Sequence, residues 1–295
     1  MAEHLIDWHL MTPDQRLEYE ARVRTRQVAL AVAAGVLVMA AVLVQIGGPH
    51  VKVNEQTLGL VTENKRFTRD LIGSVLSAFG FFALAWTLGY VWGCTRFREP
   101  KVKPGFVGAL AVAGGVLSGI SVVGYIIAYG SQAHHFVNTG SQTYPEANAL
   151  LTKPLLVVPQ ITNDFGLLLV AVGLVLVSLN AMRVGLLTKF MGYLGIIAGI
   201  LTIIPIVPIP IVEAYWLLAL AYLLSGRWPS GVPPAWSSGR AEPWPRAQRE
   251  RPAREPLLGR GRGKPAPAPA PEPVGAPAPG STRSTTPKRK RKRRK

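Results

Sequence analysis

The chain has 295 residues, of which 48% are hydrophobic, and a formal net charge of +17. From Arg227 onward lie 18 of the 33 Lys and Arg residues but only 4 of the 16 Asp and Glu residues. A basic tail therefore follows a nearly neutral, apolar body, and this asymmetry is more informative than the overall isoelectric point. The single cysteine, Cys94, excludes an intramolecular disulfide and a cysteine-cluster metal site.

Residues 1–27 are expected to form a cytoplasmic helical segment that stays in the mature protein. They contain several acidic residues and lack the short apolar core and small-residue cleavage site of a signal peptide. Thr12-Pro13-Asp14-Gln15 is typical of a helix start, with a capping threonine, a proline at the first helical position and a glutamine two residues later. We expect this helix to continue directly into the first apolar run.

Six apolar runs predict the membrane domain, because about 20 apolar residues cross the core of a bilayer as a helix. The runs are residues 28–47, 71–94, 105–130, 165–182, 190–204 and 211–225. They lack the period-2 alternation of membrane strands. The sequence therefore predicts an all-α fold, a six-span transmembrane helix bundle over residues 28–226, followed by a disordered C-terminal tail over residues 227–295.

The connections between the runs predict the orientation, since cytoplasmic loops are enriched in Lys and Arg. Residues 95–104 carry four such cations and residues 183–189 carry two, whereas residues 131–164 carry only Lys153. We therefore expect a protein of the cell membrane with both termini in the cytoplasm. The first outer loop opposes this rule, since it contains Lys52, Lys65, Arg66 and Arg69.

The last two runs are short and are joined by residues 205–210, an apolar turn with three prolines. This turn is expected at or below the outer membrane surface, where irregular backbone is tolerated only if it is covered by protein or lines a cavity. Glu213, just after the turn, and Asn180, in the fourth run, are the candidate cavity residues. For Glu213 the alternative is an interfacial position that favours the helix N-terminus.

Three pairs of glycines lie four residues apart within the runs: Gly89 and Gly93, Gly115 and Gly119, and Gly195 and Gly199. Such pairs allow close approach of helices in a membrane. They predict either packing within one chain or a helix-mediated oligomer.

The C-terminal tail has the composition of a disordered segment. Residues 265–280 are rich in alternating Pro and Ala and favour an extended polyproline II linker. The chain ends in eight consecutive cations, the candidate contacts for lipid or nucleic acid: Lys288, Arg289, Lys290, Arg291, Lys292, Arg293, Arg294 and Lys295. Anionic lipid head groups are the preferred partner. Nucleic acid is less favoured, because no aromatic residue interleaves the cations to stack on bases. A tail that only orients the protein is the third interpretation.

A family resemblance rests on three stretches of the second half of the chain. They are Asn180–Ile196, which reads NAMRVGLLTKFMGYLGI, residues 226–245, which begin GRWP and end AEPWP, and the polybasic C-terminus. Together they resemble uncharacterised actinobacterial multi-pass integral membrane proteins. The resemblance is strongest over about 165–245 and the C-terminus. It implies residence in a membrane and no activity, because none is assigned to that family.

No catalytic or cofactor motif accompanies these features. The chain lacks the phosphate-loop, H-E-x-x-H, G-x-S-x-G and C-x-x-C patterns, so we expect no cofactor, no metal and no catalytic residue. Ionisable residues are absent from the middle of every run, which argues against an ion-coupled transporter. The sequence favours a non-enzymatic scaffold or envelope component whose tail contacts anionic lipid. The alternative is a small-solute carrier or channel with its cavity near the proline turn, and an enzyme is the third hypothesis.

Overall fold

The computed structural model describes residues 12–46, 56–102, 105–204, 210–229 and 231–242. Within these ranges every regular element is a helix, as the sequence predicts. The helices are α1 (Pro13–Gln45), α2 (Gln56–Arg98), α3 (Val107–Asn138), α4 (Tyr144–Leu151), α5 (Pro154–Val184), α6 (Lys189–Ile203), α7 (Ile211–Leu224) and α8 (Pro234–Ser238).

The predicted start of α1 is confirmed by its hydrogen bonds. The Thr12 hydroxyl accepts from the Gln15 backbone N–H (3.4 Å), and the Gln15 side-chain oxygen accepts from the Thr12 N–H (3.0 Å). This reciprocal pair satisfies two backbone donors that the first helical turn leaves without a partner. The helix then runs unbroken for 33 residues, from the polar N-terminal segment through the first apolar run.

Four helices, α1, α2, α3 and α5, are long and apolar enough to cross a membrane. All six apolar runs are helical, but α6 has 15 residues and α7 only 14. At about 1.5 Å per residue these two helices reach roughly 21–22 Å, less than the roughly 30 Å core of a bilayer. Four helices rather than six therefore meet the length requirement for a span.

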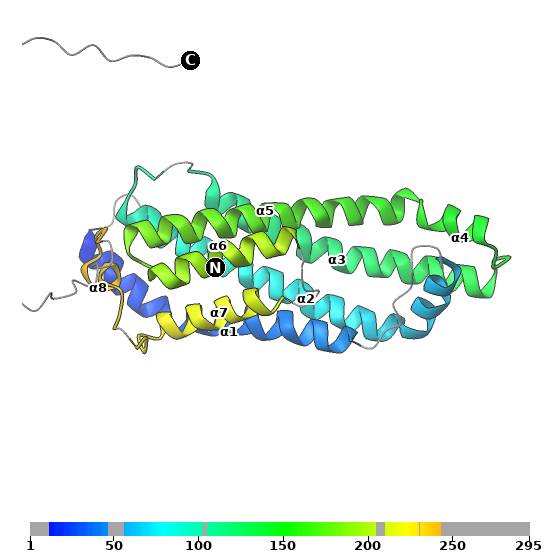
Figure 1. The fold of residues 1–295 in the computed structure, drawn as a ribbon, viewed down its shortest axis with the longest axis horizontal. Coiled ribbons are helices and arrows are strands. Elements are labelled where there is room, and N and C mark those ends of the chain that lie inside the picture. Colours follow the sequence, from blue (N-terminus) through cyan, green and yellow to red (C-terminus); the bar gives the residue numbers. More distant parts are fainter. Residues whose placement is uncertain (1–11, 47–55, 103–104, 205–209, 230, 243–295) are drawn as a thin grey trace, which may run out of the picture. The chain divides into compact units, whose positions relative to one another are not determined.

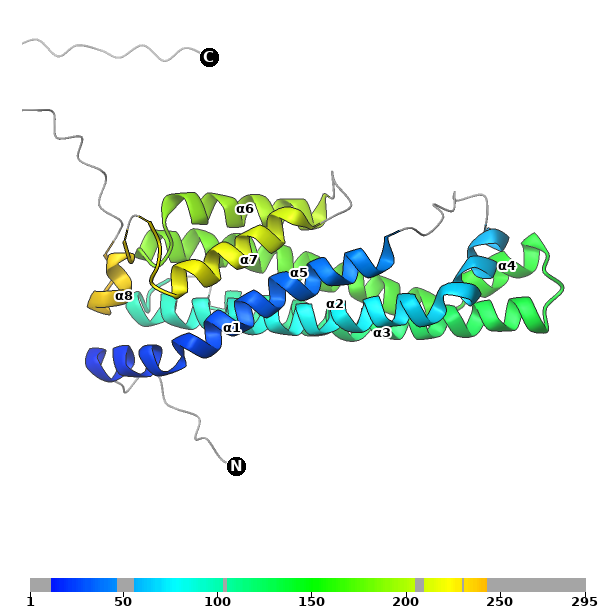
Figure 2. The same ribbon diagram turned by 90° about the horizontal axis from the view of Figure 1, so that it is seen from below.

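Six helices, α1, α2, α3, α5, α6 and α7, form a closed ring. The neighbours in contact around it are α1–α2, α2–α3, α3–α5, α5–α6, α6–α7 and α7–α1. Figures 1 and 2 show α6 and α7 running beside part of the length of α5 and α1, so that they complete the ring only over the half nearer α8. This half contains the main hydrophobic core, in which Leu84, Leu174, Trp216 and Leu220 are fully buried.

At the other end of the bundle, α2, α3 and α5 extend past the predicted runs, and α4 packs against α2 and α3 (Figure 1). A second, smaller core lies here. Leu60 of α2 and Phe136 of α3 pack against Ala147 and Leu150 of α4. The sequence predicts loops here, because these segments contain more polar residues than the apolar runs do.

Two arginines of α2 bind the carbonyl end of α1, which gives a structural role to Arg66 and Arg69, two of the four basic residues that oppose the orientation rule. Arg66 donates to the Gln45 carbonyl (3.1 Å), and Arg69 donates to the carbonyls of Val44 and Ile46. The last carbonyls of a helix lack intrahelical partners and carry the negative end of its dipole, so cations stabilise them. Lys52 lies outside the described residues.

Residues 231–242 pack against the opposite end of the bundle, so the expectation of disorder from residue 227 onward needs correction. Trp236 of α8 is 3% exposed and donates its Nε1–H to the Leu186 carbonyl (2.9 Å). Its ring stacks on Tyr90 with centroids 6.3 Å apart. Burial of this aromatic surface against α2 and the α5–α6 connection holds the segment in place. The rest of the tail, including the Pro/Ala linker and the eight terminal cations, lies outside the described residues.

Candidate functional site

A cavity of about 620 Å³ lies where the α6–α7 hairpin ends, inside the ring of helices. All six helices of the ring contribute to its wall, mostly with apolar side chains such as Val38, Phe81 and Leu167. Its polar members are Gln45, Ser77, Asn163, Thr202 and Glu213. This volume lies within the range of small-molecule sites, which typically combine apolar walls with a few polar groups.

Glu213 is the charged residue of this cavity. It lies in the first turn of α7 and is 8% exposed. Its Oε1 is buried without a hydrogen-bond partner, and no cation of the described residues forms an ion pair with it. The position at a helix N-terminus favours a carboxylate, but burial removes the water that would solvate it. Glu213 therefore lies in the wall of the cavity, and its interfacial position at a membrane surface stays a prediction.

Asn163 provides a second acceptor to the same cavity. Its Oδ1 is buried without a hydrogen-bond partner among the described residues. The Thr202 hydroxyl, in contrast, donates to the Ala198 carbonyl one turn earlier in α6 (2.9 Å). The cavity wall therefore has two unsatisfied oxygens, and a hydrogen-bond donor that enters the cavity would satisfy them.

Asn180, the other candidate from the sequence, does not line this cavity. It is 5% exposed, and its side-chain amide donates to the Leu176 carbonyl (2.8 Å) within α5. Asn163 and Gln45 line the cavity but are not among the candidate cavity residues drawn from the sequence. Asn163 belongs to the polar stretch Thr162-Asn163-Asp164 before the fourth apolar run, and Gln45 lies near the end of the first run. Both look like loop or interfacial residues until the helices are assembled.

The described residues hold no group of three or more His, Cys, Asp and Glu side chains that could bind a metal ion. Comparisons with protein-family models, curated proteins and solved structures found no match for this chain. The cavity beside Glu213 is therefore the feature from which a function can be inferred.

Proposed function

We propose that this chain is a membrane protein that binds a small, positively charged solute with N–H donors in the cavity beside Glu213, and that it acts as a carrier or channel for it. The observation that carries the proposal is the buried carboxyl of Glu213, which has an oxygen without a hydrogen-bond partner among the described residues, in a cavity lined by six helices. A protonated amine matches both the charge and the acceptors of this site.

An unpaired charge on Glu213 would be costly. A carboxylate in the bilayer interior is strongly unfavourable unless it pairs with a cation or faces water, so such residues mark solute or proton pathways. The Glu213 carboxyl is therefore either neutral or paired with a cation that enters the cavity. An ammonium group donates to Glu213 and to Asn163 without requiring any basic side chain of the protein.

The proposal includes an arrangement in the membrane. All six helices of the ring lie in the bilayer. The short α6 and α7 place their turn below the outer surface, sheltered by α1, α2, α3 and α5. The α8 end faces the cytoplasm together with both termini, as the distribution of Lys and Arg predicts. The cavity then lies in the outer half of the membrane and is reached from the side of α4.

The preferred interpretation of the sequence, a scaffold whose tail contacts anionic lipid, stays a prediction. Its eight terminal cations, Lys288 to Lys295, lie outside the described residues. The two functions are compatible, because a tail bound to the inner leaflet would leave the cavity unchanged. Deletion of residues 288–295 should abolish salt-sensitive binding of a tail peptide to anionic vesicles.

A flux measurement tests the carrier. The full-length protein is reconstituted in vesicles, and entry of small primary ammonium ions is compared with entry of neutral alcohols of the same shape. Small alcohols cross a bilayer unaided, so flux is counted as the excess over protein-free vesicles. We expect this excess for the amines alone and a loss of roughly tenfold or more in Glu213→Gln, since a hydrogen bond to a charged group contributes about 1.5–3 kcal/mol.

The matched control is Glu63→Gln. Glu63 is also 8% exposed and also has a buried oxygen without a partner, but it does not line the cavity. Equal loss in the two variants, or equal flux of amines and alcohols, would contradict the proposal.

A further inference from the structure

The three glycine pairs of the sequence have different surroundings. A Cβ built on Gly115 would lie 2.7 Å from Ala85 of α2, and one built on Gly199 would lie 2.8 Å from the Ala171 carbonyl of α5. Gly119 and Gly195 are also in close contact with neighbouring helices. Two of the pairs therefore serve packing within the chain.

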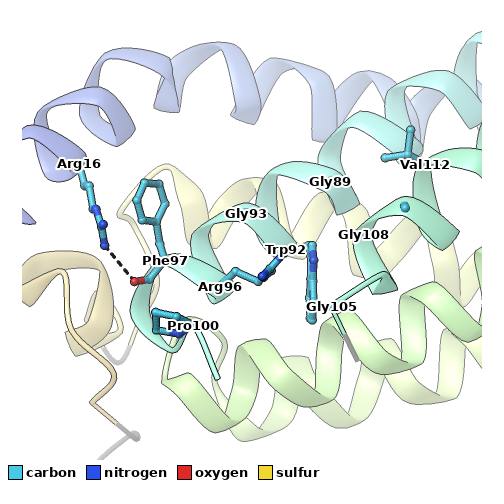
Figure 3. Close-up of a pocket in the computed structure, with 11 residues that line it drawn as sticks. Arg16, Gly89, Trp92, Gly93, Arg96, Phe97, Pro100, Gly105, Gly108 and Val112 are labelled. Carbon is cyan, nitrogen blue, oxygen red and sulfur yellow. Dashed lines mark hydrogen bonds between the residues drawn. The ribbon is translucent and has the colours of Figure 1, made fainter. Parts of the chain in front are cut away.

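The third pair, Gly89 and Gly93, is open. Among the described residues, no heavy atom lies within 4 Å of a Cβ built on Gly93, and one built on Gly89 meets only Val112, at 3.1 Å. Two cavities of about 520 and 640 Å³ adjoin here and share the residues Gly89, Gly93, Phe97 and Val112. We call this surface the Gly89–Gly93 groove. Figure 3 shows the first of the two cavities.

The end of the groove nearer α8 is basic. Arg16 and Arg96 line the first cavity, with Phe97 between them in Figure 3, and Arg26 lines the second. Arg16 lies over the Phe97 ring at 4.1 Å and donates to the Phe97 carbonyl (3.1 Å). Arg96 makes no hydrogen bond or ion pair within the part of the chain that the structure describes.

The one carboxylate that lines the groove, Glu20, is already paired. Both of its oxygens accept from the Arg98 guanidinium at 2.7 Å. The charge presented at this end of the groove is therefore positive, and it would attract an anion.

We propose that the Gly89–Gly93 groove binds an anionic phospholipid of the inner leaflet, with its phosphate at Arg96 and Arg16 and an acyl chain over the two glycines. Guanidinium groups bind phosphate oxygens in pairs, and the inner leaflet is the source of anionic lipids. The proposal rests on the α8 end facing the cytoplasm and is independent of the Glu213 cavity.

A second copy of the chain is the other occupant to consider, because exposed glycine pairs also allow helix dimers. Two copies facing each other across Gly93 would bring their Arg96 and Arg16 side chains together. Like charges at close range are unfavourable, whereas a phosphate would neutralise them. Charge complementarity therefore favours the lipid.

The test counts lipids that stay bound to the purified full-length protein. The protein is equilibrated with equal amounts of phosphatidylglycerol and phosphatidylcholine in about 0.5 M salt, which screens the exposed tail. Retained lipids are then counted by native mass spectrometry, and the size of the complex is read from the same spectrum. The variants are Arg96→Gln, which removes the charge, and Gly93→Leu, which fills the groove and keeps the charge.

Each variant has a matched control. Arg183→Gln removes an exposed cation near the same end of the bundle but outside the groove, and Gly124→Leu adds a side chain at another glycine whose Cβ position is open. We expect preferential retention of phosphatidylglycerol, a loss of roughly tenfold in Arg96→Gln and in Gly93→Leu, and no change in either control.

Three results would overturn the proposal. One is equal retention of the two lipids by the unmodified protein. Another is unchanged retention in both Arg96→Gln and Gly93→Leu. The third is a dimer that Gly93→Leu dissociates while lipid retention stays the same, which would assign the groove to a second copy.

Discussion

Glu20 of α1 and Arg98 of α2, 78 residues apart in the sequence, form a buried ion pair at the α8 end of the bundle. Two hydrogen bonds of 2.7 Å join the carboxylate to the guanidinium, and the side chains of Arg98 and Glu20 are 1% and 3% exposed. Arg98 also donates to the carbonyls of Ala235 (2.8 Å) and Cys94 (3.1 Å). One guanidinium thus connects α1, α2 and α8.

Removal of either partner should destabilise the protein strongly. We expect Glu20→Ala or Arg98→Ala to cost about 3–5 kcal/mol, because each leaves an uncompensated buried charge. The double variant should cost less than the sum of the single ones, since it leaves no lone charge. Unfolding of the detergent-solubilised protein measures this, with Arg22→Ala, at an exposed ion pair with Glu18, as the control. Additive effects would show that the pair is not coupled.

Trp236 should fix the segment after α7 to the bundle. Trp236→Ala removes a fully packed indole and is expected to cost about 3–5 kcal/mol. Trp236→Phe keeps most of the packing but leaves the Leu186 carbonyl without its donor, at about 1–3 kcal/mol. The control is Trp86→Phe, because Trp86 is 57% exposed. Thermal unfolding and protease sensitivity of residues 227–242 provide the measurements, and a Trp236→Ala variant as stable as the control would contradict this role.

The proposed membrane topology predicts the labelling of single cysteines in whole cells. A cysteine at Ser141, in the connection before α4, should react with a membrane-impermeant maleimide, whereas one at Ser281 in the tail should react only after lysis. The natural Cys94 is 3% exposed and should give little background. Labelling of Ser281→Cys in intact cells would show that the orientation is inverted.

Local rules account for much of the fold. The helices over the apolar runs were predictable, because a segment that crosses lipid must satisfy its own backbone hydrogen bonds. The start of α1 was predictable because its capping box lies within four consecutive residues. The short lengths of α6 and α7 also follow from composition, since residues 205–210 interrupt them with three prolines.

Contacts between distant segments account for the parts that were not predicted. The extension of α2 back to Gln56 depends on Leu60 meeting Phe136 and Leu150 in the small core at the α4 end. The packing of Trp236 depends on a carbonyl 50 residues earlier in the chain. Composition describes the tail as a whole, and such pairings become visible only when the helices are assembled.

The candidate site divides in the same way. Glu213 could be identified because a carboxylate is unusual beside an apolar turn. Asn180 could not be excluded, because a mild polar residue in a helix often bonds its own backbone four residues earlier, as it does here. Asn163 reaches the cavity only because α5 begins 11 residues before the apolar run does.

The most direct test of the Glu213 site is modification by an apolar carbodiimide, which reacts with carboxyl groups in apolar surroundings. The modified position is located by mass spectrometry of the reconstituted protein, with and without small protonated amines or neutral alcohols of the same shape. Modification is counted as the carbodiimide adduct plus any amide that an amine forms with the activated carboxyl. We predict modification at Glu213, protection by the amines but not by the alcohols, and no modification at this position in Glu213→Gln. A carboxyl that does not react, or that reacts equally with and without the amines, would contradict a cation site in the cavity.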